Sequence, residues 1–371
     1  MNILGIETSC DETAAAIVTE SGEGIRTWDI RSSIVASQVE IHREWGGVVP
    51  ELASRQHVRD ICGVVERAIE DADIGWSGID AVAVTQGPGL VGSLLVGVAF
   101  AKSVTLSMNV PLVAVHHLAG HIESLFLDHG SLPLPSVVLV VSGGHTSLFM
   151  VPELGCYHRL GKTRDDAAGE AYDKVSKLLG LGYPGGPIID QLAQGGYDGA
   201  VDFPVARITH ANTNVDQDVA LPDCFVKLAH RQADFSFSGL KTSVKRYLQV
   251  LCGEPSISGG PGEGNSLTHK QVADVCASFQ KAVVTALLDR TFEIAHLVGA
   301  RSIGISGGVS ANSRLRSDAI KRGVKAGTPV FVPSLKLSTD NAAMIAAAGL
   351  RRLRTGDVAG LELNADPALG L

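Results

Sequence analysis

Apolar and polar residues alternate in blocks along this chain, and residues 136–151 show the pattern clearly. The apolar run Val137–Val141 is too short for a helix and rich in β-branched residues, which predicts a buried strand. A polar turn, Ser142–Thr146, follows, and a second apolar run begins at Leu148. We therefore predict two strands joined by a glycine turn. Such glycines let the backbone approach a ligand closely and turn its N–H groups toward an anion.

Two further segments resemble this one. Residues 1–18 have the pattern of a strand, a polar turn and a second strand, and residues 301–316 that of a strand, a Gly-Gly turn and a helix beginning at Val309. A hairpin that opens each half of the chain, with a later strand–turn–helix, suggests two related lobes facing one nucleotide. The alternative is that the three turns are unrelated.

Composition narrows the choice of fold class. A chain of 371 residues, 45% of them hydrophobic, is long enough for about two domains with large cores. Strands alternate with amphipathic helices, which indicates an α/β fold. The longest apolar run, Leu90–Ala101, ends at Lys102 and is too short to span a bilayer, and acids interrupt any signal peptide. We expect no membrane partner.

Charge and cysteine content bear on the compartment and the partners. Six scattered cysteines without a CxxC pair suit a reduced, cytoplasmic protein. A net charge of −8 argues against broad binding of nucleic acid, but not against a local patch. Two basic clusters stand out, although on sequence alone a solvated helix face is the favoured explanation of each: Lys241, Lys245 and Arg246, and Arg314, Arg316, Lys321, Arg322 and Lys325.

Two histidines four residues apart, His117 and His121, predict a metal site, because a helix would place both imidazoles on one face. The alternative is a pair of ordinary histidines. A third ligand is needed, and Asp340, just before an alanine-rich helix, is a natural loop carboxylate. A zinc peptidase of the HExxH type is excluded, because Leu118 stands where the general base is required.

Taken together, these segments resemble a known family over nearly the full chain: the tRNA threonylcarbamoyladenosine transferases, called TsaD in bacteria. The motifs that carry the resemblance occur in this order: ETSCDETAAAIV, GGVVPELASRQH, QGPGLVG, HHLAGH, VSGGHT, DDAAGEAYDKVSKLLGLGYPGGP, SFSGLKT, SGGVSANSRLR and STDNAAMIA. The resemblance implies a two-lobed sugar kinase/Hsp70/actin-like (ASKHA) fold, with duplicated mixed-sheet lobes around a central cleft.

The resemblance also implies a reaction. The family transfers threonylcarbamoyl from threonylcarbamoyl-AMP to N6 of the adenosine 3′ of the anticodon, position 37, in tRNAs that read codons starting with A, and AMP is released. The metal triad of the family matches His117, His121 and Asp340, and its ion is Fe²⁺ or, as the alternative, Zn²⁺. We assign proton transfer or carbonyl positioning to Asp11 or Glu12. The substrate-binding positions match Val140, Val141, Ser142, Gly143, Gly144, Asp173, Gly186, Asp190 and Asn312.

Further expectations concern domains and partners. The resemblance implies an N-terminal lobe at 1–116 and a C-terminal lobe at 117–351 with the metal and nucleotide site, while residues 352–371 pack back on the first lobe. A TsaB-like homologous partner and a TsaE-like ATPase are expected. Segments 208–233 and 254–268 look longer than usual. Two other functions stay open: a metal-dependent glycoprotein endopeptidase, and a non-enzymatic nucleotide-binding scaffold.

Overall fold

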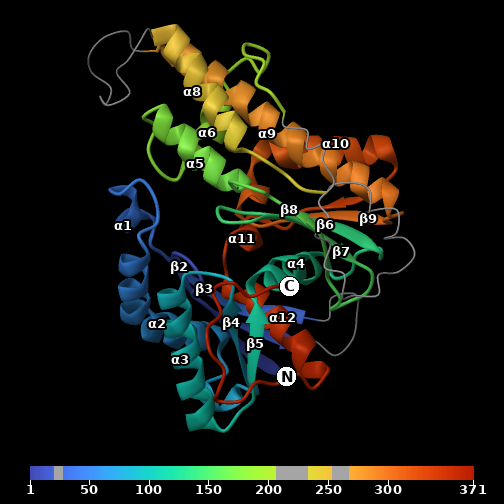
Figure 1. Cartoon of the computed structure of the whole chain (residues 1–371). Helices are drawn as coiled ribbons and strands as arrows, with labels where there is room; N and C mark the ends of the chain where they lie inside the picture. Colours follow the sequence, from blue (N-terminus) through green and yellow to red (C-terminus); the bar gives the residue numbers. More distant parts are fainter. Residues whose placement is uncertain (21–27, 206–232, 253–266) are drawn as a thin grey trace. The chain divides into compact units, whose positions relative to one another are not determined.

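The computed structural model describes residues 1–20, 28–205, 233–252 and 267–371. The chain forms two compact units, coloured along the sequence in Figure 1. Unit 1 comprises Met1–Leu132, Glu153–Tyr157 and Pro333–Leu371, and unit 2 comprises Pro133–Pro152 and His158–Val332. The long segments 208–233 and 254–268 lie almost entirely outside the described residues.

The units differ from the expected boundaries of 1–116 and 117–351. Helix α4 (His117–His129) belongs to unit 1, because it continues directly from the last strand of that unit's sheet. Helix α12 (Ala342–Arg354) belongs there too, because it packs on α4 and on the same sheet. After α12 the chain stays in unit 1, where Ala359 bridges Leu112. The three predicted metal ligands are therefore in unit 1 and not in a C-terminal lobe.

The short segment Glu153–Tyr157 also joins unit 1. The hydroxyl of Tyr157 donates to Glu123 of α4 at 2.5 Å, and Arg351 of α12 binds the other oxygen of the same carboxylate at 2.7 Å. Glu123 is fully buried, so these two partners satisfy a charge that would otherwise be costly to remove from water.

Unit 1 is built on a mixed five-stranded sheet of order β3-β2-β1-β4-β5. Strands β3, β2 and the central β1 pair antiparallel, and β4 and β5 run parallel to β1. The strands are β1 (Asn2–Glu7), β2 (Glu12–Glu20), β3 (Trp28–Ser37), β4 (Ala81–Gly87) and β5 (Leu112–His116). The strand–turn–strand pattern predicted for residues 1–18 is thus confirmed, with Glu7 at the end of β1 and Glu12 at the start of β2.

Helices cover both faces of this sheet. Side chains alternate along β1: Ile3 packs against α12, whereas Leu4 and Ile6 pack against α2 (Pro50–Ala72) and α3 (Val91–Met108). Shorter elements are α1 (Val39–Arg43), the 3₁₀ turn η1 (Trp76–Gly78) and α11 (Leu335–Ser338). The buried face of α12 is mostly alanine, which allows the helix to lie very close to β1.

Helix α3 is long and apolar enough, by length and composition alone, to cross a membrane. It is longer than the apolar run seen in the sequence, because it continues past Lys102 to Met108. In unit 1 it packs on β4 and α2, with Leu94 and Ala101 fully buried. One face of α3 therefore packs in unit 1, whereas Leu95 and Leu106 on its other face are exposed.

Unit 2 repeats the sheet topology of unit 1, in the order β8-β7-β6-β9-β10. Again three strands are antiparallel and two run parallel to the central one. The strands are β6 (Ser136–Val141), β7 (Thr146–Val151), β8 (His158–Lys162), β9 (Ser302–Ser306) and β10 (Val330–Phe331). The prediction of an α/β fold with duplicated mixed sheets is confirmed.

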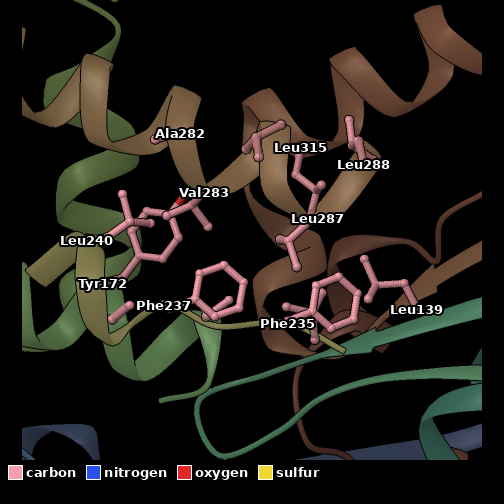
Figure 2. Packing of buried hydrophobic residues seen from close by; sticks show 14 of the residues in the cluster. Leu139, Tyr172, Phe235, Phe237, Leu240, Ala282, Val283, Leu287, Leu288 and Leu315 are labelled. Atoms are coloured by element: carbon pink, nitrogen blue, oxygen red, sulfur yellow. The ribbon is translucent and has the colours of Figure 1, made fainter. Parts of the chain in front are cut away.

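The helices of unit 2 enclose its largest apolar core (Figure 2). The ring of Tyr172 meets that of Phe279 edge-on at 5.2 Å between centroids, and Phe237 is fully buried beside them. The helices are α5 (Ala168–Leu178), α6 (Gly185–Ala193), α8 (Ser238–Cys252), α9 (His269–Leu297) and α10 (Ser313–Ala326). The helix predicted from Val309 begins instead at Ser313, after the 3₁₀ turn η2 (Gly308–Ala311).

The approach of α12 to β1 depends on Gly5, and this gives a test of the packing. A Cβ at Gly5 would lie 2.9 Å from the Cβ of Ala346 and would overlap the α12 backbone. We expect Gly5→Ala to lower the free energy of unfolding by about 1–3 kcal/mol through overpacking. Urea unfolding midpoints measure the effect.

Gly63 on the exposed face of α2 provides the matched control, since a Cβ there meets no atom within 4 Å. Gly63→Ala should raise the free energy of unfolding by about 0.5–1 kcal/mol, because alanine is the better helix former. Shifts of the same sign in the two variants would contradict the close approach of α12.

Candidate functional site

The candidate metal centre lies where β5 ends. The chain passes into α4 without a loop, so His117 is the first residue of the helix and His121 lies one turn later. Asp340 reaches the same place from the loop between α11 and α12. Oδ1 of Asp340 lies 3.1 Å from Nε2 of His121 and 3.6 Å from Nε2 of His117. The three ligand atoms lie within 4.8 Å of one another, so one cation can bind all three.

The chemistry of these residues fits a divalent metal. Both ring nitrogens of His121 are buried, and neither has a hydrogen-bond partner among the described residues. Nε2 of His121 lies close to Asp340 but without hydrogen-bond geometry. A buried unpaired polar group costs about 1–3 kcal/mol, which coordination of a cation would offset. Two imidazoles and a carboxylate form a donor set that suits Fe²⁺ and Zn²⁺.

Glu7 orients His117 from the opposite side of the ring. Its Oε2 accepts a hydrogen bond from Nδ1 of His117 at 2.9 Å, which leaves Nε2 directed at the metal position. Glu7 is fully buried, and it also accepts from the backbone N–H of Ser9 at 2.6 Å and from the hydroxyl of Thr85 at 2.8 Å. A carboxylate behind a metal-binding histidine fixes the tautomer and the direction of the ring.

The charges at this centre attract a cation. Burial would raise the pKa of the Glu7 carboxyl, but the charge of His117 and its hydrogen bond outweigh burial and lower that pKa. Burial would lower the pKa of His117, but the carboxylates of Asp340 and Glu7 raise it to about 9. The same two carboxylates would attract a metal ion that takes the place of the proton.

Asp11 and Glu12 follow in the β1–β2 turn and at the start of β2. Asp11 is buried and Glu12 is half-buried. Burial, and then the carboxylates of Asp11 and Asp340, raise the pKa of Glu12 well above its ordinary value. The effect of Asp340 means that Glu12 is within electrostatic range of the metal centre. A carboxyl with a raised pKa is suited to accept or give a proton near neutral pH.

A buried histidine holds the β1–β2 turn in place. Nε2 of His57, in α2, donates to the backbone oxygen of Cys10 at 2.9 Å. Its Nδ1 accepts from the hydroxyl of Thr13 at 2.7 Å and from the amide of Gln38 at 3.3 Å. Cys10 and Thr13 flank the acids at 11 and 12, so His57 fixes both ends of the segment that carries them.

Gln38 extends this network to α1. Its backbone N–H donates to the backbone oxygen of Asp11 at 2.9 Å, and its Oε1 accepts from Nε2 of His42 at 3.3 Å. Nδ1 of His42 accepts from the backbone N–H of Val49 at 3.3 Å. Each donor in this hydrogen-bond network meets an acceptor when both imidazoles carry their single proton on Nε2.

The predicted substrate-binding residues all lie in unit 2. Val140 and Val141 end β6 and are fully buried, so they offer a ligand their backbone rather than their side chains. Ser142 closes the turn, since its N–H donates to the backbone oxygen of His145 at 2.8 Å. Gly143 and Gly144 are exposed, and a Cβ at either would meet no atom within 4 Å.

Asp190 and Asn312 belong to one hydrogen-bonded network. Asp190, on α6, accepts from the amide of Gln280 at 3.0 Å and from the hydroxyl and backbone N–H of Ser313 at 2.8 and 3.0 Å. Gln280, on α9, in turn accepts from the amide of Asn312 at 2.9 Å. Oδ1 of Asn312 accepts from the N–H of Leu315 and so caps α10. The network fixes the start of α10.

Asp173 and Gly186 lie at the junction of α5 and α6. Oδ1 of Asp173 accepts from the N–H of Gly185 at 2.7 Å. A Cβ at Gly185 would lie 2.8 Å from the Cα of Asp173, whereas one at Gly186 would meet no atom within 4 Å. Gly185 therefore serves the packing of the two helices, and Gly186 faces open space.

Residues that sequence reasoning missed support the predicted ones. Glu7 and His57 support the metal centre and the acidic turn, and Gln280 links Asp190 to Asn312. The signal for Glu7 was an acid at the end of an otherwise apolar strand. Nothing in the spacing of His57 or Gln280 indicated these contacts.

Comparisons with known proteins agree on one family. A family model described as tRNA N6-adenosine threonylcarbamoyltransferase (TsaD) matches residues 29–347. A protein of Moorella thermoacetica with that name is 48% identical over 370 residues, which cover 100% of this chain and 97% of that protein. One of Anaeromyxobacter dehalogenans is 47% identical over 367 residues, covering 99% and 98%.

Among solved structures, full-length HypF in a phosphate- and nucleotide-bound form has a similar fold. The TM-score is 0.55 at 13% sequence identity, over 95% of this chain and 46% of that one. At this level of identity the likeness concerns the fold alone.

The contact between Glu7 and His117 predicts an effect on metal binding. Glu7→Gln keeps an acceptor for Nδ1 but removes the charge behind the ring, so we expect divalent-metal affinity to fall about 10-fold. Competition with a chromophoric chelator measures it. Glu40→Gln, on the exposed face of α1, is the control and should bind metal as the wild type does. Unchanged affinity in Glu7→Gln would contradict the orienting role.

The buried state of His57 predicts a pH dependence of stability. Burial lowers the pKa of His57 below its ordinary 6.5. Because the unfolded chain takes up the proton first, the stability that neutral His57 contributes is present above pH 6.5 and is lost as pH falls through its lower folded pKa. Urea midpoints between pH 7.5 and pH 5 should therefore decline less in His57→Gln, which keeps a donor and an acceptor, than in the wild type. Parallel declines would refute this account.

Proposed function

Because this chain belongs to the TsaD family of tRNA N6-adenosine threonylcarbamoyltransferases, we propose that it transfers a threonylcarbamoyl group to N6 of adenosine 37 in tRNAs that read codons starting with A. The donor is threonylcarbamoyl-AMP, and AMP is released. Near full-length similarity to proteins of this name supports the activity. The observation in the structure that carries the proposal is the buried cluster of His117, His121 and Asp340.

His117, His121 and Asp340 would hold one divalent metal. Fe²⁺ is our first assignment and Zn²⁺ the alternative, since this donor set suits both. When bound, the ion acts as a Lewis acid that polarises an oxygen of the donor. Glu7 keeps the ring of His117 in the orientation that coordination needs.

The reaction needs an activated donor because N6 of adenine is a weak nucleophile, its lone pair being delocalised into the ring. N6 attacks the carbamoyl carbon, the bond from that carbon to the phosphate oxygen breaks, and AMP leaves with the electron pair. The proton released from N6 goes to Glu12, whose raised pKa suits this role. Asp11 supports Glu12 from the adjacent position.

Residues of unit 2 bind the adenylate. The exposed turn at Gly143 and Gly144 gives a phosphate access to backbone N–H groups. Asn312 faces the nucleoside, and its position is fixed through Gln280 by Asp190. Asp173 and Gly186 complete the set at the junction of α5 and α6.

We further propose that the protein is cytoplasmic and acts with a TsaB-like homologous protein and a TsaE-like ATPase. The scattered cysteines and the net charge of −8 support a cytoplasmic protein whose partners contribute to holding tRNA.

The activity is tested with the purified chain, these partners, synthetic threonylcarbamoyl-AMP and an unmodified tRNA, with the modified nucleoside measured by mass spectrometry. His121→Ala should lose metal and product together, by at least about 100-fold. His129→Ala, in the last turn of the same helix and outside the metal cluster, should retain both.

Other outcomes would favour other functions. Full activity of metal-free protein would remove the metal from the mechanism. Hydrolysis of a glycoprotein that disappears in His121→Ala would favour a metallopeptidase. Binding of the adenylate without transfer to any tRNA would favour a nucleotide-binding scaffold.

A further inference from the structure

The proposed function requires a surface for tRNA on a chain that is acidic overall. The sequence contains two basic clusters, one on α8 and one on α10. Exposed cations matter for nucleic-acid binding only where protein carboxylates do not already neutralise them. The ion pairs and the exposure of each cluster therefore decide which of the two is available to bind nucleic acid.

No carboxylate of the described residues forms an ion pair with the cations of α8. The helix, SGLKTSVKRYLQVLC, contains no acidic residue, and Lys241, Lys245 and Arg246 form no ion pair within the described residues. Lys245 and Arg246 are exposed, and Lys241 is half-buried. The buried residues of α8, Leu240, Val244 and Leu248, pack into the unit 2 core. Arg246 lies on the opposite, solvent-facing side of the helix, and Lys241 and Lys245 lie one turn apart at the border between the two sides.

The position of Lys241 along α8 raises the positive electrostatic potential at the start of the helix. Lys241 lies in the first turn of the helix, where the positive end of the helix dipole adds to its charge. A lysine there is unfavourable for the helix itself. Lys241 and Lys245 are one turn apart on the same face, and Thr242, next to Lys241 in the sequence, is also exposed. Hydroxyl and cationic side chains of this kind contact phosphate backbones.

The cations of α10 are partly neutralised by protein carboxylates. Arg314 pairs with Asp198 at 2.7 Å and with Asp318 at 3.3 Å, and Arg322 pairs with Asp289. Among the other cations of this cluster, Lys321 and Lys325 lie in the C-terminal half of the helix, beside strongly exposed Val324. There the negative end of the helix dipole lowers the potential.

The start of α8 is also tied to the predicted substrate residues of the same unit. Asp165, just before α5, accepts from the backbone N–H of Phe237 at 2.8 Å and from the hydroxyl of Ser238 at 2.8 Å. Hydrogen bonds from Ser236 and Ser238 outweigh burial and lower the pKa of Asp165. Figure 1 shows α8 beside α5 and α9, and α5 carries Asp173. The helix that carries the basic residues thus packs against the helix that carries Asp173.

We propose that the solvent face of α8, with Lys241, Lys245 and Arg246, binds the phosphate backbone of the tRNA substrate. This proposal rests on the proposed function, because it takes tRNA as the partner. The contacts hold the RNA by charge and do not read its sequence.

The two helices provide a matched pair of variants. Lys241→Ala/Lys245→Ala and Lys321→Ala/Lys325→Ala each remove two lysines one turn apart. Binding of an unmodified tRNA transcript to the full-length chain is measured against salt concentration. The α8 variant should bind on the order of 10- to 100-fold more weakly at about 0.1 M salt, with a slope of log K against log salt shallower by about 2. The α10 variant should match the wild type in affinity and slope.

A charge-preserving variant, Lys241→Arg/Lys245→Arg, should keep the affinity and the salt slope of the wild type. The metal content of every variant should equal that of the wild type. An α8 variant that binds like the wild type, a larger loss in the α10 variant, or no binding of tRNA by the wild-type chain would each overturn the proposal. Modification of tRNA by the wild type is assayed in parallel. If that activity is present while the α8 variant binds normally, the docking surface is wrong and the transferase function stands.

Discussion

The buried hydrogen bond between Glu7 and His117 is the interaction on which the candidate site depends. It joins the end of β1 to the start of α4, and Glu7 reaches β4 as well through Thr85. A carboxylate buried in this way is stable only with all of its partners in place. The sheet and the candidate metal centre therefore depend on one side chain. Glu7 links the ends of β1 and β4 and orients His117.

The two units share a sheet topology but use the equivalent hairpin differently. In unit 1 the turn after the first strand is acidic, is held from behind by His57, and lies near the metal ligands. In unit 2 it is a glycine turn with open space around it, and the polar network lies on the helices instead. The two units therefore share one sheet topology, and they differ in the side chains at the ends of their strands.

The strands, the two related sheets and the pairing of His117 with His121 could be predicted because these leave local patterns in the sequence. A short β-branched run between glycines predicts a strand wherever it occurs, and HxxxH needs only a helix. The boundaries of the units depended on which helices pack on which sheet, and here the prediction departed from the structure at α4 and α12. The roles of His57 and Gln280 could not be predicted, because their partners lie far away in the sequence and such contacts leave no periodic pattern.

The return of the chain to unit 1 after residue 333 has a consequence for biosynthesis. Helix α12 fills one face of the first sheet, and the loop before it carries Asp340. A ribosome therefore releases the whole of unit 2 before the amino-terminal sheet can be covered. Until then one apolar side of that sheet has no α12 to cover it, and the histidines of α4 lack Asp340, so a cation that binds all three residues could be acquired only at the last stage of synthesis.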